Sequence, residues 1–266
     1  MAFHKYRNQS LFYETFGQGE RALLFIHGLA AHSNCWKYQV DFFKDRFLIV
    51  TVDLFGHGQS SKDVDPIFAP RIDAEAIVGL MNQVIKKPFI AIGHSFASQI
   101  LPEIVKLDSP YLKGVVFVDC TYQGFEDVIK ARADFGTSLL KLSDNELKVE
   151  AEKWYSGMIA ESSGAEHQNL IMSGLKYCNY RWLFQSVAGC VEYNLKYPPD
   201  KTPIKNDLPI FIMETDSAVG ADFRKSWVNH FKNARYFLFE KADHFVFITQ
   251  HSRFNGFLDE FISDCF

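Results

Sequence analysis

The chain has 266 residues, of which 47% are hydrophobic and 23% are charged. It is long enough to bury a large core and too highly charged for a membrane bundle, and its composition excludes a disulfide-stabilised miniprotein and a disordered tail. The formal charge is −4 and the pI is about 6.1, without a block of basic residues, so we expect no nucleic-acid partner.

The cysteines and the N-terminal residues favour a cytoplasmic location. The five cysteines are odd in number, widely spaced and never in a Cys-x-x-Cys arrangement, which favours neither a disulfide framework nor a metal site. Charged residues interrupt the N-terminus before an apolar signal segment can form, and no apolar run approaches the roughly 18 residues of a membrane span. We therefore expect a soluble cytoplasmic protein without a membrane partner, as a monomer or homodimer.

Short apolar runs bounded by turn residues are typical of buried parallel strands. They lie at 22–26, 47–52, 89–92, 114–118, 209–213 and 234–239. Segments with helical spacing lie between or after them, at 33–43, 73–86, 96–107, 222–231 and 245–262. Strand alternating with helix predicts a parallel sheet covered on both faces. Two further strand-like segments, around 5–7 and 11–16, predict an antiparallel hairpin at the sheet edge.

The stretch from 121 to 205 departs from this alternation. It contains no strand-like run and predicts amphipathic helices at 125–135, 143–160, 165–178 and 181–195. We interpret it as a helical lid that is inserted into a core formed by residues 1–120 and 206–266, and that lies over the ends of the sheet. The alternative is a second independent domain, because about 85 residues can fold alone.

The most informative segment is Gly93-His94-Ser95-Phe96-Ala97, which joins an apolar strand directly to a helical pattern. This is the strand, turn and helix context of a Gly-x-Ser-x-Gly nucleophile, in which small neighbours allow the serine a strained backbone. Ala97 stands where glycine is usual. An N-cap serine is the alternative interpretation of Ser95. The motifs described next favour a nucleophile at a helix N-terminus that stabilises a developing anion.

Two further turns follow strands. His27-Gly28 follows the first parallel strand and can direct the next backbone N–H toward the end of the sheet. We predict that the N–H groups of Leu29 and Phe96 form an oxyanion hole, with Ala30 as the alternative donor to Leu29. The ring of His27 is expected to pack in the turn. The second turn, Asp53-x-x-Gly-His-Gly-x-Ser, is expected to be scaffold, with Asp53 accepting backbone N–H bonds.

These three motifs, at these separations, resemble the α/β-hydrolase superfamily. The resemblance implies an α/β-hydrolase fold, a mostly parallel doubly wound sheet with an N-terminal antiparallel hairpin and a helical lid insertion, and it implies no cofactor. Family members carry nucleophile, acid and histidine in that chain order, each after a strand. The resemblance therefore assigns Ser95 as the nucleophile, Asp216 as the acid and His244 as the base. Glu214, Asp222 and Asp119 are alternative acids, since no glycine precedes Asp216.

The resemblance implies a serine hydrolase that cleaves a small-to-medium apolar carboxylic ester through an acyl-enzyme. Alternatives are carbon–carbon bond, thioester or carrier-bound methyl ester hydrolysis or perhydrolysis by the same triad, and a non-catalytic small-ligand receptor. The expected substrate-binding side chains are aromatic, namely Phe125, Trp154, Trp182 and Phe245. An acidic carrier protein could meet Lys130, Arg132 and Lys141 on the lid, although a solvated helix face explains these charges as well.

Overall fold

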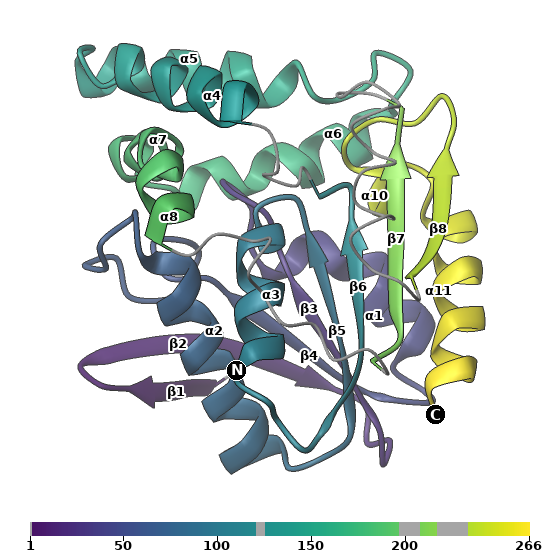
Figure 1. The fold of residues 1–266 in the computed structure, drawn as a ribbon. Helices are drawn as coiled ribbons and strands as arrows, with labels where there is room; N and C mark the ends of the chain where they lie inside the picture. The colour runs from purple at the N-terminus through teal and green to yellow at the C-terminus, as the bar shows by residue number, and fades with distance from the viewer. Residues whose placement is uncertain (1, 121–125, 197–207, 217–233) are drawn as a thin grey trace.

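The computed structural model describes residues 2–120, 126–196, 208–216 and 234–266, and its central feature is an eight-stranded sheet (Figure 1). The strand order is β1-β2-β4-β3-β5-β6-β7-β8. The strands are β1 (Ala2–Tyr6), β2 (Gln9–Phe16), β3 (Ala22–Ile26), β4 (Leu48–Asp53), β5 (Phe89–His94), β6 (Leu112–Val118), β7 (Ile210–Thr215) and β8 (Ala234–Phe239). β2 pairs antiparallel with β1 and β4, and all other neighbours are parallel. The predicted sheet and its N-terminal hairpin are confirmed.

The central strands are apolar because both faces of the sheet are covered. Every residue of β3, β5 and β7 is buried. Successive side chains point to opposite faces, so Leu24 of β3 packs with the helices of one face and its neighbour Phe25 with those of the other. Each fully buried side chain of this kind contributes about 1.5–3 kcal/mol to folding.

Helices α2 and α3 cover one face of the sheet, and α1 and α11 cover the other (Figure 1). The helices and helical turns of the core are η1 (Ser33–Trp36), α1 (Lys37–Phe43), α2 (Ala69–Leu80), η2 (Met81–Ile85), α3 (Ala97–Lys106), α10 (Val246–Thr249) and α11 (His251–Cys265). The helix expected from residue 73 begins at Ala69, because Pro70 suits a first helical turn. The helix expected at 245–262 is divided in two near Gln250, and the one expected at 222–231 lies outside the described residues.

Between β6 and β7 the described chain is helical, and these helices lie above the carboxyl ends of the strands (Figure 1). We call residues 126–196 the lid. It contains α4 (Glu126–Leu139), α5 (Asp144–Ser156), α6 (Ala165–Met172), η3 (Ser173–Tyr177), α7 (Tyr180–Ala188) and α8 (Cys190–Lys196). The helix expected at 181–195 is broken at Gly189, where a Cβ would lie 2.4 Å from Cγ1 of Ile67. The expected ends of the insertion, 121 and 205, lie outside the described residues.

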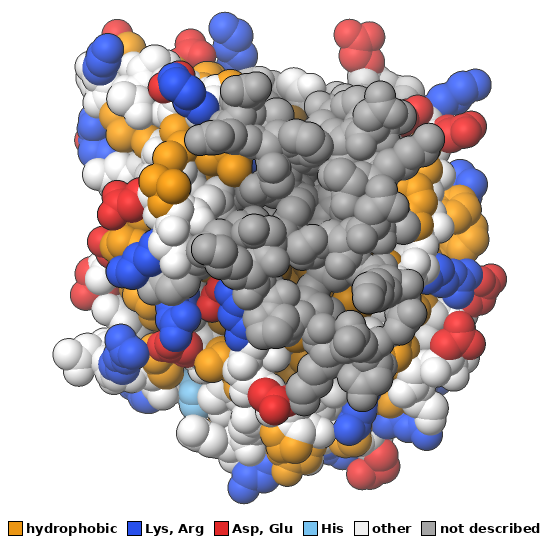
Figure 2. Space-filling model, viewed as in Figure 1, with side chains coloured by type: hydrophobic (Ala, Val, Ile, Leu, Met, Phe, Trp, Pro, Cys, Tyr) orange, Lys and Arg blue, Asp and Glu red, His pale blue; other side chains and the backbone are white. Residues whose placement is uncertain are grey.

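The visible surface carries charges of both signs. Around the margin of the face in Figure 2, basic and acidic side chains are interspersed, and the coloured residues of that face form no large patch of one sign. Within the described ranges, no helix is both long enough and apolar enough to pass through a lipid bilayer.

Candidate active site

Loops from the carboxyl ends of neighbouring strands meet beneath the lid. Ser95 follows β5, Asp119 follows β6 and His244 follows β8. In a parallel sheet these ends form the crevice where ligands bind. Ser95 and His244 line one cavity of about 320 Å³, whose other walls come from the core and the lid.

Ser95 occupies a tight turn between β5 and α3. Its φ is +52°, in the left-handed region, which costs a non-glycine residue about 1–3 kcal/mol. Its N–H donates to the carbonyl of Val118 at 3.0 Å and so ties the turn to the end of β6. The side chain is partly exposed, whereas those of its neighbours His94 and Phe96 are buried. The turn has the predicted geometry of a nucleophile between a strand and a helix.

Two glycines allow this turn to form. A Cβ on Gly93 would lie 2.6 Å from Cβ of Ala97, and a Cβ on Gly28 would lie 3.0 Å from Cβ of Ser95. Because Gly93 has no side chain, the methyl group of Ala97 fits where the family pattern has glycine. Gly28 in turn brings the loop after β3 against Ser95.

His244 is held by Asp119. Nδ1 of His244 donates to Oδ2 of Asp119 at 2.5 Å, and both side chains are buried. Oδ1 of Asp119 accepts two further hydrogen bonds at 2.9 Å, from the backbone N–H and the hydroxyl of Thr215. These three bonds orient the carboxylate. Because Nδ1 makes the contact with Asp119, Nε2 of the imidazole takes no part in it.

Asp216 does not pair with His244, so the prediction that it is the acid is wrong in geometry. Its carboxylate accepts the N–H groups of Lys241 at 2.8 Å and Ala242 at 3.2 Å. It therefore stabilises the turn that precedes His244. The side-chain contacts decide the assignment, because the Asp119 carboxylate reaches Nδ1 of His244 whereas that of Asp216 is engaged by the 241–242 backbone. Asp119 was one of the alternatives, and another, Asp222, lies outside the described residues.

Two residues beside Ser95 have backbone N–H groups without an acceptor among the described residues. Among the described residues, neither Leu29 nor Phe96 donates its backbone N–H to an acceptor, and both residues line the cavity with Ser95. The alternative donor, the N–H of Ala30, is engaged by Nε2 of His57 at 3.1 Å. Leu29 and Phe96 thus remain the candidate oxyanion-hole donors, whereas the N–H of Ala30 is already engaged.

Buried histidines brace the turns beside the site. Nε2 of His27 accepts the N–H of Leu54 at 3.0 Å, and the rings of His27 and His57 lie 5.2 Å apart. Burial lowers the pKa of each to about 3, so both are neutral and can accept these bonds. The predicted packing role of His27 is confirmed. Asp53 accepts N–H groups from Ser33 and Gln59 as expected.

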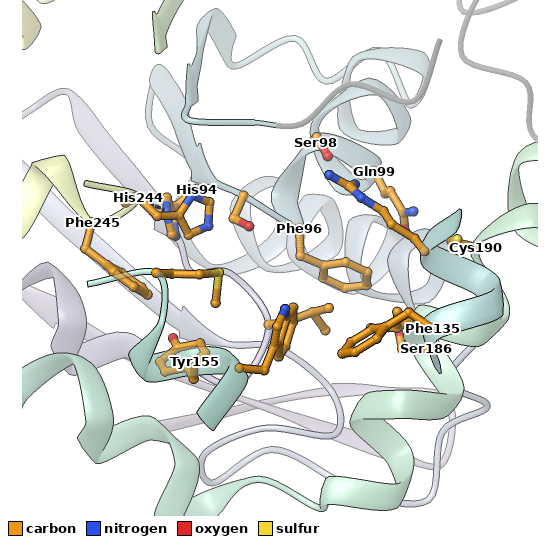
Figure 3. Close-up of a pocket in the computed structure, with 16 residues that line it drawn as sticks. His94, Phe96, Ser98, Gln99, Phe135, Tyr155, Ser186, Cys190, His244 and Phe245 are labelled. Atoms are coloured by element: carbon orange, nitrogen blue, oxygen red, sulfur yellow. Dashed lines mark hydrogen bonds between the residues drawn. The ribbon is translucent and has the colours of Figure 1, made fainter. Parts of the chain in front are cut away.

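The cavity has mainly apolar walls (Figure 3). Trp154 and Phe245 line it, as predicted. Trp182 does not, because its indole donates to the carbonyl of Val64 at 2.9 Å and its ring covers Gly56. The Trp182 prediction is therefore wrong, and Phe125 lies outside the described residues. Among the described residues, no group of three or more His, Cys, Asp and Glu side chains could hold a metal ion.

Two residues that the sequence analysis did not single out position His244. Nε2 of His94 donates to the carbonyl of His244 at 2.8 Å, and burial holds the pKa of His94 well below its usual value, so the ring is neutral. Asp243 accepts the N–H of Ala160 at 3.1 Å and the hydroxyl of Ser163 at 3.0 Å, which ties the His244 loop to the lid. The sequence signal for these two residues is their position, since His94 directly precedes Ser95 and Asp243 directly precedes His244.

The three basic lid residues do not form one surface. Lys130 is exposed and pairs with Asp134 at the same face of α4, and Lys141 is also exposed. Arg132 is instead partly buried and lines the cavity. The structure thus separates the charges that were considered as a joint docking face.

Comparison with known proteins agrees with this geometry. Residues 23–256 match the sequence profile of the alpha/beta hydrolase family. The chain belongs to this family. The (E)-2-((N-methylformamido)methylene)succinate hydrolase of Acinetobacter baylyi is 20% identical over 253 residues, which cover 93% of this chain and 92% of that protein. The 3-oxoadipate enol-lactonase 2 of the same organism is 35% identical, but over 69 residues, or 26% of each chain.

Solved structures of other family members share the fold. An esterase from Thermogutta terrifontis superposes with a TM-score of 0.75 at 16% identity, covering 97% of this chain and 94% of that one. The enol-lactonase from Burkholderia xenovorans gives a TM-score of 0.76 at 15% identity, covering 98% of this chain and 100% of that one. At such identities the likeness concerns the fold alone.

Gly93→Ala should destabilise the protein, because the added methyl would lie 2.6 Å from Cβ of Ala97 and 2.9 Å from Cδ1 of Leu101. We expect a loss of about 2–3 kcal/mol in the free energy of unfolding, measured by urea titration. Ala97→Gly in the same chain should recover at least half of that loss, although alone it costs about 1 kcal/mol in a helix. Strictly additive losses would contradict the proposed close contact.

Acidification should destabilise the folded state through His27 and His57. Their folded pKa of about 3 lies below the unfolded value of 6.5, so below pH 6.5 the unfolded chain binds protons that the folded chain does not. Stability is therefore lost as the pH falls from 6.5 toward 3, by up to about 1.4 kcal/mol per pH unit for each ring. His57→Gln keeps an acceptor for the N–H of Ala30. It should reduce the pH dependence of the free energy of unfolding by the equivalent of about one bound proton, measured by urea titrations from pH 7 to 5. Parallel curves for the two proteins would contradict the assignment.

Proposed function

We propose that the protein is a serine hydrolase that cleaves a carboxylic ester through an acyl-enzyme. The observation that carries the proposal is one cavity in which Ser95, His244 and the unpartnered N–H groups of Leu29 and Phe96 meet. Family membership and the esterases and lactonases among the relatives support it. A lactone is an intramolecular ester, so both substrate types need the same chemistry.

Each group has a role that its chemistry supports. Ser95 Oγ attacks the acyl carbon, and Nε2 of His244 takes its proton. Asp119 holds the Nδ1–H tautomer and stabilises the imidazolium that forms. The N–H groups of Leu29 and Phe96 receive the oxyanion. His244 then gives its proton to the leaving alcohol, and a water molecule activated by the same imidazole releases the acid.

The cavity supports a small-to-medium substrate. Its volume of about 320 Å³ lies at the lower end of ligand pockets. The apolar and aromatic side chains of Leu29, Phe135, Trp154, Tyr155, Met158 and Phe245 line it, so the body of the substrate is apolar.

Ser95→Ala should lower kcat on p-nitrophenyl butyrate by about 10⁴- to 10⁶-fold with an unchanged circular dichroism spectrum. A fluorophosphonate should form one adduct, on Ser95, detected by peptide mass spectrometry. The exposed lid serine offers a control, since Ser138→Ala should retain both activity and adduct. Labelling of no residue, together with no turnover of any ester, would favour the receptor alternative.

Asp119→Asn and Asp216→Asn separate the two carboxylates. Asp119→Asn should lower kcat by about 10³- to 10⁴-fold, because the amide does not favour the required imidazole tautomer. Asp216→Asn should change kcat by less than about 10-fold and destabilise the 241–242 turn by about 1 kcal/mol, because it weakens two backbone hydrogen bonds. The reverse order of effects on kcat would reinstate Asp216 as the acid.

A further inference from the structure

One side chain of the cavity has no function in the chemistry proposed above. Arg132 of α4 lines the cavity, and among the described residues it has no ion-pair or hydrogen-bond partner. Lys130, on the same helix, is exposed and paired with Asp134. A guanidinium carries five N–H donors that demand acceptors, and partial burial makes an unpaired charge costly.

The described surroundings of Arg132 contain no group that neutralises its charge. No Asp or Glu is found among the described residues that line the cavity. Its charge acts on the Cys190 thiol, and burial raises the pKa of that thiol, which keeps it neutral. Arg132 therefore gives one end of a largely apolar cavity a positive charge that no described residue compensates.

Neutral polar groups line the cavity with Arg132. Ser98, Gln99 and Ser186 are each more than nine-tenths buried, and their side chains form no hydrogen bond with any described residue. Buried polar groups in proteins are nearly always hydrogen-bonded, so three such side chains opening into one cavity indicate a polar ligand group.

The position of this polar end decides which part of the substrate it meets. In Figure 3, His244 and Phe245 lie at one side of the cavity, and Gln99, Ser186 and Cys190 lie at the other. His244 must protonate the leaving alcohol, so that alcohol lies on the His244 side. The acyl chain then extends toward the side of Gln99 and Cys190, and Arg132 interacts electrostatically with Cys190.

We propose that Arg132 binds a carboxylate at the far end of the acyl chain, so that the preferred substrate is a monoester or lactone of a dicarboxylic acid. The inference rests on the proposed hydrolase function and specifies its substrate class. The planar guanidinium matches a carboxylate in a bidentate pair, and Ser98, Gln99 and Ser186 can donate to its remaining lone pairs. The apolar wall between the two polar ends accommodates the methylene chain.

The test compares two p-nitrophenyl esters with acyl chains of equal length, the glutarate monoester and the neutral valerate. Wild-type kcat/KM should be about 10- to 100-fold higher for the anionic ester, because the free energy of a charge-assisted hydrogen bond corresponds to a ratio of this size. Arg132→Gln should remove this preference by lowering kcat/KM far more for the glutarate monoester than for valerate, and Arg132→Lys should keep part of it. Lys130→Gln removes the same charge from the exposed face of α4 and should leave the preference unchanged.

The outcomes separate the two proposals. Equal wild-type rates on the two esters, or equal losses on both in Arg132→Gln, would overturn the carboxylate site while leaving the hydrolase intact. If wild type cleaves neither ester, the hydrolase proposal fails, and calorimetric titration with glutarate then judges the site. Glutarate binding to wild type that Arg132→Gln abolishes would support the site, and no binding to wild type would overturn it.

Discussion

The close approach of the turns after β3 and β5 is the constraint on which the site depends. A side chain at Gly28 would strike Ser95, and one at Gly93 would strike Ala97. Without these side chains, Ser95 adopts a positive φ at the start of α3, and the N–H groups of Leu29 and Phe96 line the same cavity. Overpacking either glycine would move Ser95 and the N–H groups of Leu29 and Phe96 together, because a packed interior transmits strain.

Around this turn, charge is confined to a few oriented groups. His27, His57 and His94 are buried and neutral, and each forms a hydrogen bond that holds a loop in place. Asp119 is also buried, but three hydrogen bonds to His244 and Thr215 satisfy it. A buried carboxylate that is held in this way orients the imidazole at little further cost, since its hydration has already been replaced.

The lid contributes to the site in two ways. Trp154 and Tyr155 give the cavity an apolar wall, and Arg132 gives it a positive charge. Asp243 joins the lid to the His244 loop by accepting from Ala160 and Ser163. The residues that shape the substrate cavity are therefore coupled mechanically to the imidazole, although the two segments are far apart in the chain.

The sequence by itself determined the sheet, the turn around Ser95 and the position of His244 after the last strand. Local patterns carry this information, because a buried parallel strand is apolar on both faces and a strained turn requires small neighbours. The sequence did not distinguish Asp119 from Asp216, since each directly follows a strand. Tertiary contacts decided between them, because Asp119 bonds to His244 and Asp216 bonds to the 241–242 backbone.

Tertiary structure also decided the roles of two lid residues. Trp182 and Arg132 both lie on amphipathic helices, and helical spacing alone left open which of them faces the cavity. Packing turned the Trp182 indole to Val64 and left Arg132 in the cavity wall. The physical reason is that the face a lid helix presents depends on contacts with segments distant in sequence, which no local pattern encodes.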